Sequence, residues 1–248
     1  MSSSTLPFGI DVSSWQGTIN WNVVAAYRPK VEFVAIRAGT SWGYKDPTFD
    51  YNWREARRVG IPRTAYHVFF PGEDPVRQMN HFLNIVGNDH GELPLTEDIE
   101  LHHNVPPATY RIRLYNALQY LKQRSNRPAI IYSRASFMDH YVTSTSTPPS
   151  WYGQHDWWLA QYLLSGVEHP GPPALPKGVT RDRVIMHQTS DRGAPIGVSS
   201  NTLDYNRWQF PLSHLLNYVT NSLPPPVPVE DRVRRLQLSI RDFMDLFK

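Results

Sequence analysis

The chain has 248 residues, of which 40% are hydrophobic and 12% aromatic, and its formal net charge is +3. This content supplies a substantial core, so it excludes a wholly disordered chain and is compatible with one α/β barrel or two small domains. No apolar run approaches the roughly 20 residues that a membrane-spanning helix needs. The absence of cysteine excludes disulfides, thiolate nucleophiles and cysteine-bound zinc. The positive charge is small and dispersed, so we expect no nucleic-acid partner.

The first 210 residues predict alternating strands and helices. The strands of five βα units are predicted at 8–12, 32–37, 64–70, 93–100 and 129–132, and their helices at 21–27, 47–59, 75–86, 108–124 and 135–141. Three bare strands follow at 157–162, 184–188 and 202–204, separated by loops rich in proline and glycine. Eight strands of parallel type close into an α/β barrel. An open doubly wound sheet is the alternative, but no Gly-x-Gly-x-x-Gly motif follows the first strand.

The end of the sequence predicts a separate segment. Residues 223–228 read Leu-Pro-Pro-Pro-Val-Pro, which is typical of a stiff linker. Beyond it, apolar residues from Val229 to Phe247 recur at alternating spacings of four and three, the pattern of an amphipathic helix. We therefore divide the chain into a barrel at 1–221, a linker at 222–228 and a helix at 229–248. Docking of this helix on the barrel, self-association through it, and contact with a membrane or wall are the open alternatives.

Two carboxylates end the fourth predicted strand. Asp98 and Glu100 lie two residues apart, so on a strand they point the same way with Cα atoms roughly 6.6 Å apart. The carboxyl ends of barrel strands form the active face, and two acids this close titrate at different pH values. A proton donor and a carboxylate are what hydrolysis of a glycosidic bond requires. A lone Asp-x-Glu is also common at solvated strand ends. Glu97 alternates to the other face, and we expect it to be structural.

Two more acids belong to the same end of the predicted barrel. Asp11 ends the first strand and Asp204 lies in the eighth, so both are predicted to reach the mouth that holds the Asp-x-Glu pair. An acid between an apolar strand and a polar turn also fits a simple turn former, and that alternative stays open for Asp11.

Aromatic residues gather at or beyond predicted strand ends. Aromatic rings stack on the apolar faces of sugars, so a set on one rim predicts a sugar-binding site, whereas each ring singly fits a core position better. The set comprises Trp42, Tyr66, Phe69, Tyr132, Trp157 and Trp158, with polar Arg37, Gln161 and Gln188 nearby.

The ten histidines raise the alternative of a metal site. His102 and His103 are adjacent, so on regular structure they point apart, and no His-Glu-x-x-His motif is present. A Gly-x-Ser-x-Gly elbow and a P-loop are also missing, which disfavours a serine hydrolase and a nucleotide site. We expect no metal and no cofactor, because carboxylates alone carry glycoside hydrolysis.

Seven motifs, in order along the first 210 residues, resemble glycoside hydrolase family 25, the Chalaropsis-type muramidases. Each is short, but seven in one order are specific. They are Gly-Ile-Asp-Val-Ser-Ser-Trp-Gln-Gly at 9–17 with Ile-Asn-Trp at 19–21, Phe-Val-Ala-Ile-Arg-Ala at 33–38 with Asp-Pro-Thr-Phe at 46–49, Ala-Tyr-His-Val-Phe at 65–69, the Asp-x-Glu segment at 95–100, Ile-Ile-Tyr at 130–132, Trp-Leu-Ala-Gln-Tyr at 158–162 and Leu-Asp-Tyr-Asn at 203–206.

The resemblance implies an irregular TIM-like barrel of five βα units and three β-strands. It also implies hydrolysis of the β-1,4 bond between N-acetylmuramic acid and N-acetylglucosamine in peptidoglycan. By position, Glu100 is the implied general acid and Asp98 its assistant, and Asp11 and Asp204 are further acids of the cleft. The expected substrate contacts are Tyr66, Arg37, Gln161, Tyr132, Trp158 and Gln188.

This sequence departs from the family pattern at two places. His187-Gln188-Thr189 stands where the family usually has Trp-Gln and an aromatic, so one side of the sugar cleft is expected to differ. Glu97 replaces a small or apolar residue, which adds a charge beside Asp98.

Carboxylates on one strand lie on one side of the cleft. We therefore expect assistance by the substrate's 2-acetamido group, oriented by Asp98, and net retention at the anomeric carbon. The alternative functions are another N-acetyl-sugar glycosidase, such as a chitinase, and a non-catalytic wall-binding barrel. The first eight residues show no signal peptide, which predicts a phage-type endolysin released from the cytoplasm, unless a signal has been removed.

Overall fold

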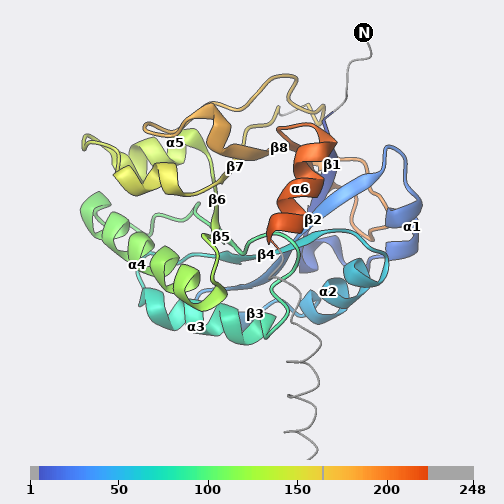
Figure 1. The fold of residues 1–248 in the computed structure, drawn as a ribbon, viewed down its shortest axis with the longest axis horizontal. Helices are drawn as coiled ribbons and strands as arrows, with labels where there is room; N and C mark the ends of the chain where they lie inside the picture. The colour runs from blue at the N-terminus through green and yellow to red at the C-terminus, as the bar shows by residue number, and fades with distance from the viewer. Residues whose placement is uncertain (1–5, 164, 223–248) are drawn as a thin grey trace, which may run out of the picture.

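A computed structural model describes residues 6–163 and 165–222, which form a closed barrel with helices around its outside (Figure 1). The predicted helix at 229–248 and, apart from Ser222, the predicted linker at 222–228 lie outside the described residues. No helix among the described residues combines the length and the apolar character needed to cross a membrane.

Eight strands close the barrel, in agreement with the predicted number. Around the barrel, β1, β2, β4, β5, β6, β7 and β8 pair in parallel with their neighbours in this order, whereas β9 pairs antiparallel with both β8 and β1. The expectation of parallel pairing throughout is therefore wrong for β9, because no crossover helix separates it from β8 and the chain turns straight back. The barrel strands are β1 (Phe8–Val12), β2 (Val31–Thr40), β4 (Arg63–Val68), β5 (Thr96–Asp98), β6 (Ile130–Ser133), β7 (Trp157–Ala160), β8 (Val184–Gly193) and β9 (Leu203–Trp208).

The predicted helices cover the outside of the barrel (Figure 1). They are α1 (Trp21–Ala26), α2 (Phe49–Arg58), α3 (Pro75–Val86), α4 (Pro107–Ser125) and the short α5 (Ala135–Phe137), which a π-helical segment continues through Met138–Thr143. The start of α3 shows why the sequence predicted it: the Asp74 side chain accepts from the Arg77 amide, and Pro75 occupies the first turn.

One strand and one α-helix were not predicted. The two-residue strand β3 (Tyr44–Lys45) pairs antiparallel with the end of β2 and is too short to leave a periodic pattern. Helix α6 (Leu212–Ser222) packs where the parallel strands begin: Tyr218 lies 5.3 Å from the Trp208 ring between centroids, and its hydroxyl donates to Asp156, the residue before β7, at 2.6 Å. This helix therefore packs against the end of the barrel opposite the predicted active face.

Strand residues alternate between the helices outside and the barrel interior. Val34 and Ile36 of β2 belong to the outer core under the helices, whereas Phe33 and Ala35 belong to the inner cluster. Gly9 of β1 faces this interior, where a Cβ atom would lie 2.4 Å from the Phe33 ring. The alternation of period two that the sequence showed thus decides which side chains enter the barrel.

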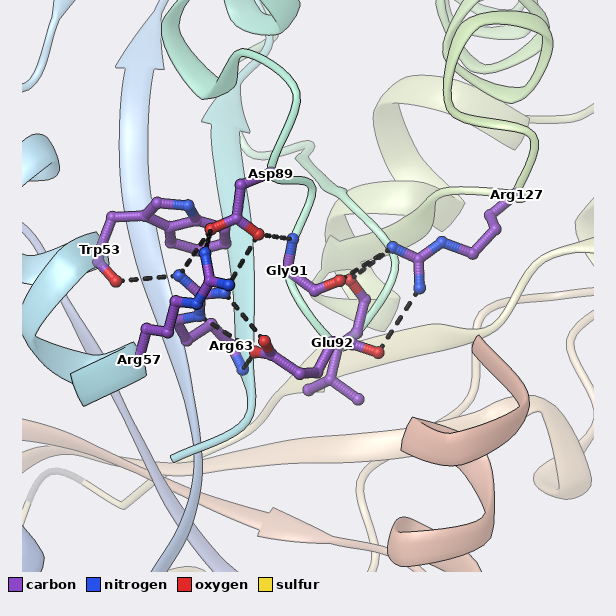
Figure 2. Close-up of polar contacts among 8 residues, drawn as sticks. Trp53, Arg57, Arg63, Asp89, Gly91, Glu92 and Arg127 are labelled. Carbon is purple, nitrogen blue, oxygen red and sulfur yellow. Dashed lines mark hydrogen bonds and ion pairs between the residues drawn. The ribbon is translucent and has the colours of Figure 1, made fainter. Parts of the chain in front are cut away.

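An ion-pair network holds the beginnings of β4 to β6 together (Figure 2). The Arg63 side chain is 1% exposed and donates to Glu92 at 2.8 Å and to Asp89 at 3.1 Å, while its guanidinium lies 4.2 Å from the Trp53 ring centroid. Arg127, just before β6, donates to the carbonyl oxygens of Gly91 and Leu93. The charge of the deeply buried arginine is therefore balanced, at the end of the barrel away from the predicted mouth.

Candidate active site

A cavity of about 230 Å³ opens at the end of the barrel where the parallel strands finish. Every acid and every substrate contact that the resemblance implies, except Gln161, lines it. The lining residues are Asp11, Ser13, Trp15, Gln16, Arg37, Tyr66, Val68, Asp98, Glu100, Tyr132, Trp158, Gln188 and Asp204. The barrel thus gathers acids that are as far apart in sequence as residues 11 and 204.

Asp11 is held by amide groups from two other strands. It is 4% exposed, and its Oδ2 accepts from Gln188 Nε2 at 3.0 Å and from Asn206 Nδ2 at 2.8 Å. Gln188 Oε1 in turn accepts from the Tyr132 hydroxyl at 2.8 Å, and Asn206 Oδ1 accepts from Trp158 Nε1 at 2.7 Å. The sequence reasoning did not select Asn206, although it lies two residues from Asp204 and so shares its face of β9.

Asp98 and Glu100 occupy different depths. Asp98 ends β5 and is 5% exposed, and its Oδ1 is buried without a hydrogen-bond partner among the described residues. Burial, with repulsion from Glu100, Glu97 and Asp11, raises the pKa of Asp98 well above its ordinary value. Glu100 lies two residues beyond the strand and is exposed at the mouth, because the strand predicted to reach it ends at Asp98. Partial desolvation raises the pKa of Glu100, against the opposing charge of Arg134.

The acids on β1 and β9 form a second pair. Burial and the adjacent Asp11 charge raise the pKa of Asp204 to about 9. Burial also raises the pKa of Asp11, while the hydrogen bonds from Asn206 and Gln188 favour its ionised form. Burial raises the pKa values of all four carboxyl groups, and that of Asp204 lies far enough above neutrality for the cavity to retain a proton at pH 7.

Glu97 lies on the opposite face of β5 from Asp98, as strand alternation predicts. It is fully buried, with Oε1 2.9 Å from His67 Nδ1, and His67 Nε2 lies 2.6 Å from the Ser41 carbonyl oxygen. Burial raises the pKa of Glu97 despite the neighbouring imidazole. The pair lies outside the barrel interior, and the negative charge of Glu97 is one of those that raise the pKa of Asp98.

Arg37 connects the cavity to the loop after β1. Its Nε donates to Asp46 Oδ2 at 2.9 Å and its Nη2 donates to Ser14 Oγ at 3.0 Å. Asp46 also accepts from the Ser14 amide at 2.9 Å. Arg37 therefore fixes the position of the loop that carries Trp15.

The predicted aromatic rim is only partly correct. Tyr66, Tyr132 and Trp158 line the cavity, with ring centroids of Tyr132 and Trp158 4.5 Å apart. Phe69 and Trp157 are instead fully buried in the outer core, because they occupy the alternate, outward-facing positions.

Two exposed tryptophans differ from the sequence prediction, which placed Trp42 on the rim and gave Trp15 no role. Trp42 lies outside the cavity, and the Arg77 guanidinium packs 3.5 Å from its ring centroid. Trp15, which was not selected, lines the acid cavity and is 79% exposed. Its signal was available, since it lies in the Ser-Ser-Trp-Gln segment just beyond the first strand.

Gln161 lies in a neighbouring cavity of about 340 Å³. Its Oε1 accepts from the Ala174 amide at 2.6 Å and its Nε2 lies 3.0 Å from His169 Nε2. In the described part of the chain, no group of three or more histidine, aspartate or glutamate side chains is arranged to hold a metal ion.

Comparisons with known proteins agree with this geometry. The family model for glycosyl hydrolases family 25 matches residues 10–198. The chain is 29% identical over 214 residues to the protein YegX of Escherichia coli, covering 85% of this chain and 72% of that one. It is 27% identical over 224 residues to Lysozyme M1 of Streptomyces globisporus, covering 86% and 71%. The structure of the bacterial lysozyme from Streptomyces coelicolor matches with a TM-score of 0.71 and 27% identity, covering 89% of this chain and all of that one.

Proposed function

The chain belongs to glycosyl hydrolases family 25 and is a glycoside hydrolase of the muramidase class, and we propose that it cleaves the β-1,4 bond between N-acetylmuramic acid and N-acetylglucosamine in peptidoglycan. The observation that carries this proposal is the meeting of Asp11, Asp98, Glu100 and Asp204 in one cavity beside aromatic rings. Acids with raised pKa values supply the proton, and the rings supply stacking surfaces for sugars.

Glu100 is the proposed general acid. It stands at the mouth, within reach of a polymer that lies across the barrel, and its raised pKa favours the protonated form. Its carboxyl group donates this proton to the glycosidic oxygen as the bond from that oxygen to C1 of the muramyl sugar breaks.

Asp98 is the proposed partner of the substrate's 2-acetamido group. Its unpaired buried Oδ1 requires a donor, which the amide N–H of that group supplies. The acetamido oxygen attacks C1 and forms a cyclic oxazolinium ion. The hydrogen bond from the acetamido N–H favours the ionised form of Asp98, and this carboxylate balances the positive charge of the oxazolinium ring.

Water completes the reaction from the face that the leaving sugar has left. The Glu100 carboxylate takes a proton from this water as its oxygen attacks C1, and the acetamido ring opens. Two inversions at C1 give net retention. Proton NMR of fresh product tests this mechanism: we expect the β-anomer first, and initial α-anomer would refute it.

Product analysis tests the function itself. Peptidoglycan is digested, the products are reduced with borohydride, and mass spectrometry identifies the sugar at the new reducing end. We expect reduced N-acetylmuramic acid, and no comparable release from chitin. Reduced N-acetylglucosamine would assign the opposite bond, equal cleavage of chitin would favour a general N-acetyl-sugar glycosidase, and binding without product would favour a non-catalytic wall protein.

A further inference from the structure

The neighbouring cavity of about 340 Å³ is lined by residues at and just beyond the ends of two strands, β6 and β7, that also line the acid cavity. Tyr132 of β6 and Trp158 of β7 line the acid cavity, and Arg134 and Tyr162, further along the same two segments, line the neighbouring one. Both cavities therefore lie at the same end of the barrel, beyond neighbouring strands.

Arg134 contributes an exposed positive charge to the neighbouring cavity. Its Cζ lies 4.9 Å from the Tyr162 ring centroid and its Nη2 contacts the Tyr162 hydroxyl, and among the described residues it forms no ion pair. Arg37 and Arg207, by contrast, are paired with Asp46 and Glu168. The charge of Arg134 also reaches Glu100, whose pKa it lowers. A guanidinium held by a ring but not neutralised is suited to an anionic ligand.

Hydrogen bonds fix the far wall of this cavity. The Gln161 side chain holds Ala174 and His169, as described above, and the Gln161 carbonyl oxygen lies 2.8 Å from His187 Nε2. The main-chain amide of Gln161 also donates to the Gln188 carbonyl oxygen at 3.1 Å. The cavity is therefore formed before a ligand enters, which lowers the entropic cost of binding.

We propose that this cavity binds a carboxylate carried by the 3-O substituent of the muramyl sugar, with Arg134 as the specificity-determining residue. The inference rests on the proposed function. The muramyl ring differs from glucosamine by a lactyl group, which ends in a free carboxylate or continues into a stem peptide with carboxylates of its own. The planar guanidinium binds such a group through two parallel hydrogen bonds, while Tyr162 holds its orientation.

The test compares Arg134→Gln with the wild type on three substrates: glycan strands with free lactyl carboxylates, the same strands after methyl esterification, and peptide-bearing strands. We expect KM to rise about tenfold for Arg134→Gln on a carboxylate-bearing substrate, with the loss in KM rather than in kcat. Arg134→Lys retains the charge and is expected to recover most of the loss. Esterified strands should be cleaved with equal KM by both enzymes. The carboxylate-bearing substrate that shows the loss identifies the source of the carboxylate.

Arg124→Gln is the matched control, because Arg124 is an exposed arginine in the last turn of α4, away from both cavities. An unchanged KM for Arg134→Gln on both carboxylate-bearing substrates would overturn the inference. An equal rise in KM on esterified strands would also overturn the inference, because Arg134 would then act only through its charge on Glu100. That role would shift the pH profile of kcat on every substrate.

A binding measurement separates this inference from the proposed function. Calorimetry with strands bearing free lactyl carboxylates, and with peptide-bearing strands, compares Glu100→Gln with the double variant Glu100→Gln/Arg134→Gln. We expect about tenfold weaker binding by the double variant to at least one of them, whether or not the wild type turns over peptidoglycan. Equal affinities would overturn the inference, whereas failure to release muramyl reducing ends would overturn the proposed function alone.

Discussion

The amide nitrogen of Asn206 lies 2.8 Å from Oδ2 of Asp11, so the last strand of the barrel holds a carboxyl group on the first. Asn206 Oδ1 accepts a hydrogen bond from Trp158 Nε1. This contact fixes the orientation of the Asn206 amide, so its N–H group points to Asp11. Asn206 thereby connects the acids to the aromatic wall of the cavity.

Asn206→Ala is expected to damage both the site and the fold. Asp11 loses a donor that favours its ionised form, so its pKa rises further, and Trp158 keeps a buried N–H without an acceptor. We expect kcat/KM to fall by about one to two orders of magnitude and the free energy of unfolding by about 1–3 kcal/mol. Reducing-end assays and urea denaturation measure these changes. Asn84→Ala, at an exposed position of α3, is the control, and equal behaviour of the two variants would contradict the role of Asn206.

Glu100→Gln is expected to lower kcat by about 10³-fold while leaving the fold intact, because the amide cannot donate the acid's proton. The position is exposed, so circular dichroism and the unfolding midpoint should match the wild type. Glu32→Gln, at the start of β2 and paired with Lys30, is the control at the far end of the barrel. Turnover at the wild-type rate in Glu100→Gln would remove Glu100 from the role of acid.

Asp204→Asn is expected to stabilise the protein in a manner that depends on pH. The unfolded chain loses the Asp204 proton near pH 4, whereas the folded chain keeps it up to about pH 9, so this group's contribution to stability is lost as pH rises between these values. Asparagine does not ionise and still donates to Asp11. The difference in unfolding free energy between variant and wild type should be near zero at pH 4 and on the order of 2 kcal/mol at pH 7.

Urea denaturation at pH 4, 7 and 9 measures this difference. Asp50→Asn provides the control, since the Asp50 side chain is 68% exposed and forms a surface ion pair with Lys45, which contributes little to stability. If the difference in unfolding free energy between Asp204→Asn and the wild type is the same at pH 4, 7 and 9, Asp204 has the same pKa in the folded protein as in the unfolded chain, which would contradict this prediction.

Trp15→Ala is expected to raise KM several-fold without lowering the unfolding midpoint. The side chain is largely exposed and lines the acid cavity, so its ring has little packing to lose and is available to stack on a sugar. The paired variant is Trp42→Ala, whose ring packs on Arg77 outside the cavity and should not affect KM. A larger KM change for Trp42→Ala would favour the rim as first predicted from the sequence.

Local patterns in the sequence were sufficient to predict most elements of the barrel. Strand periodicity placed Asp98 inside and Glu97 outside, and the capping residues Asp74 and Gly87 marked both ends of α3. These features depend on neighbours a few residues away, which is why they can be predicted without knowing which strands pair. The order of seven motifs then indicated the family from the same local information.

What the sequence determined by itself was the kind of chemistry: which positions carry acids and which strands they end. Closure of the barrel decided which of these side chains meet and how their pKa values shift. The reversal of β9 places Asn206 against Asp11, 195 residues away, and the packing of α6 fills the opposite end. Such contacts depend on the pairing of distant strands, and the raised pKa values exist only because closure brings mutually repelling acids together away from water.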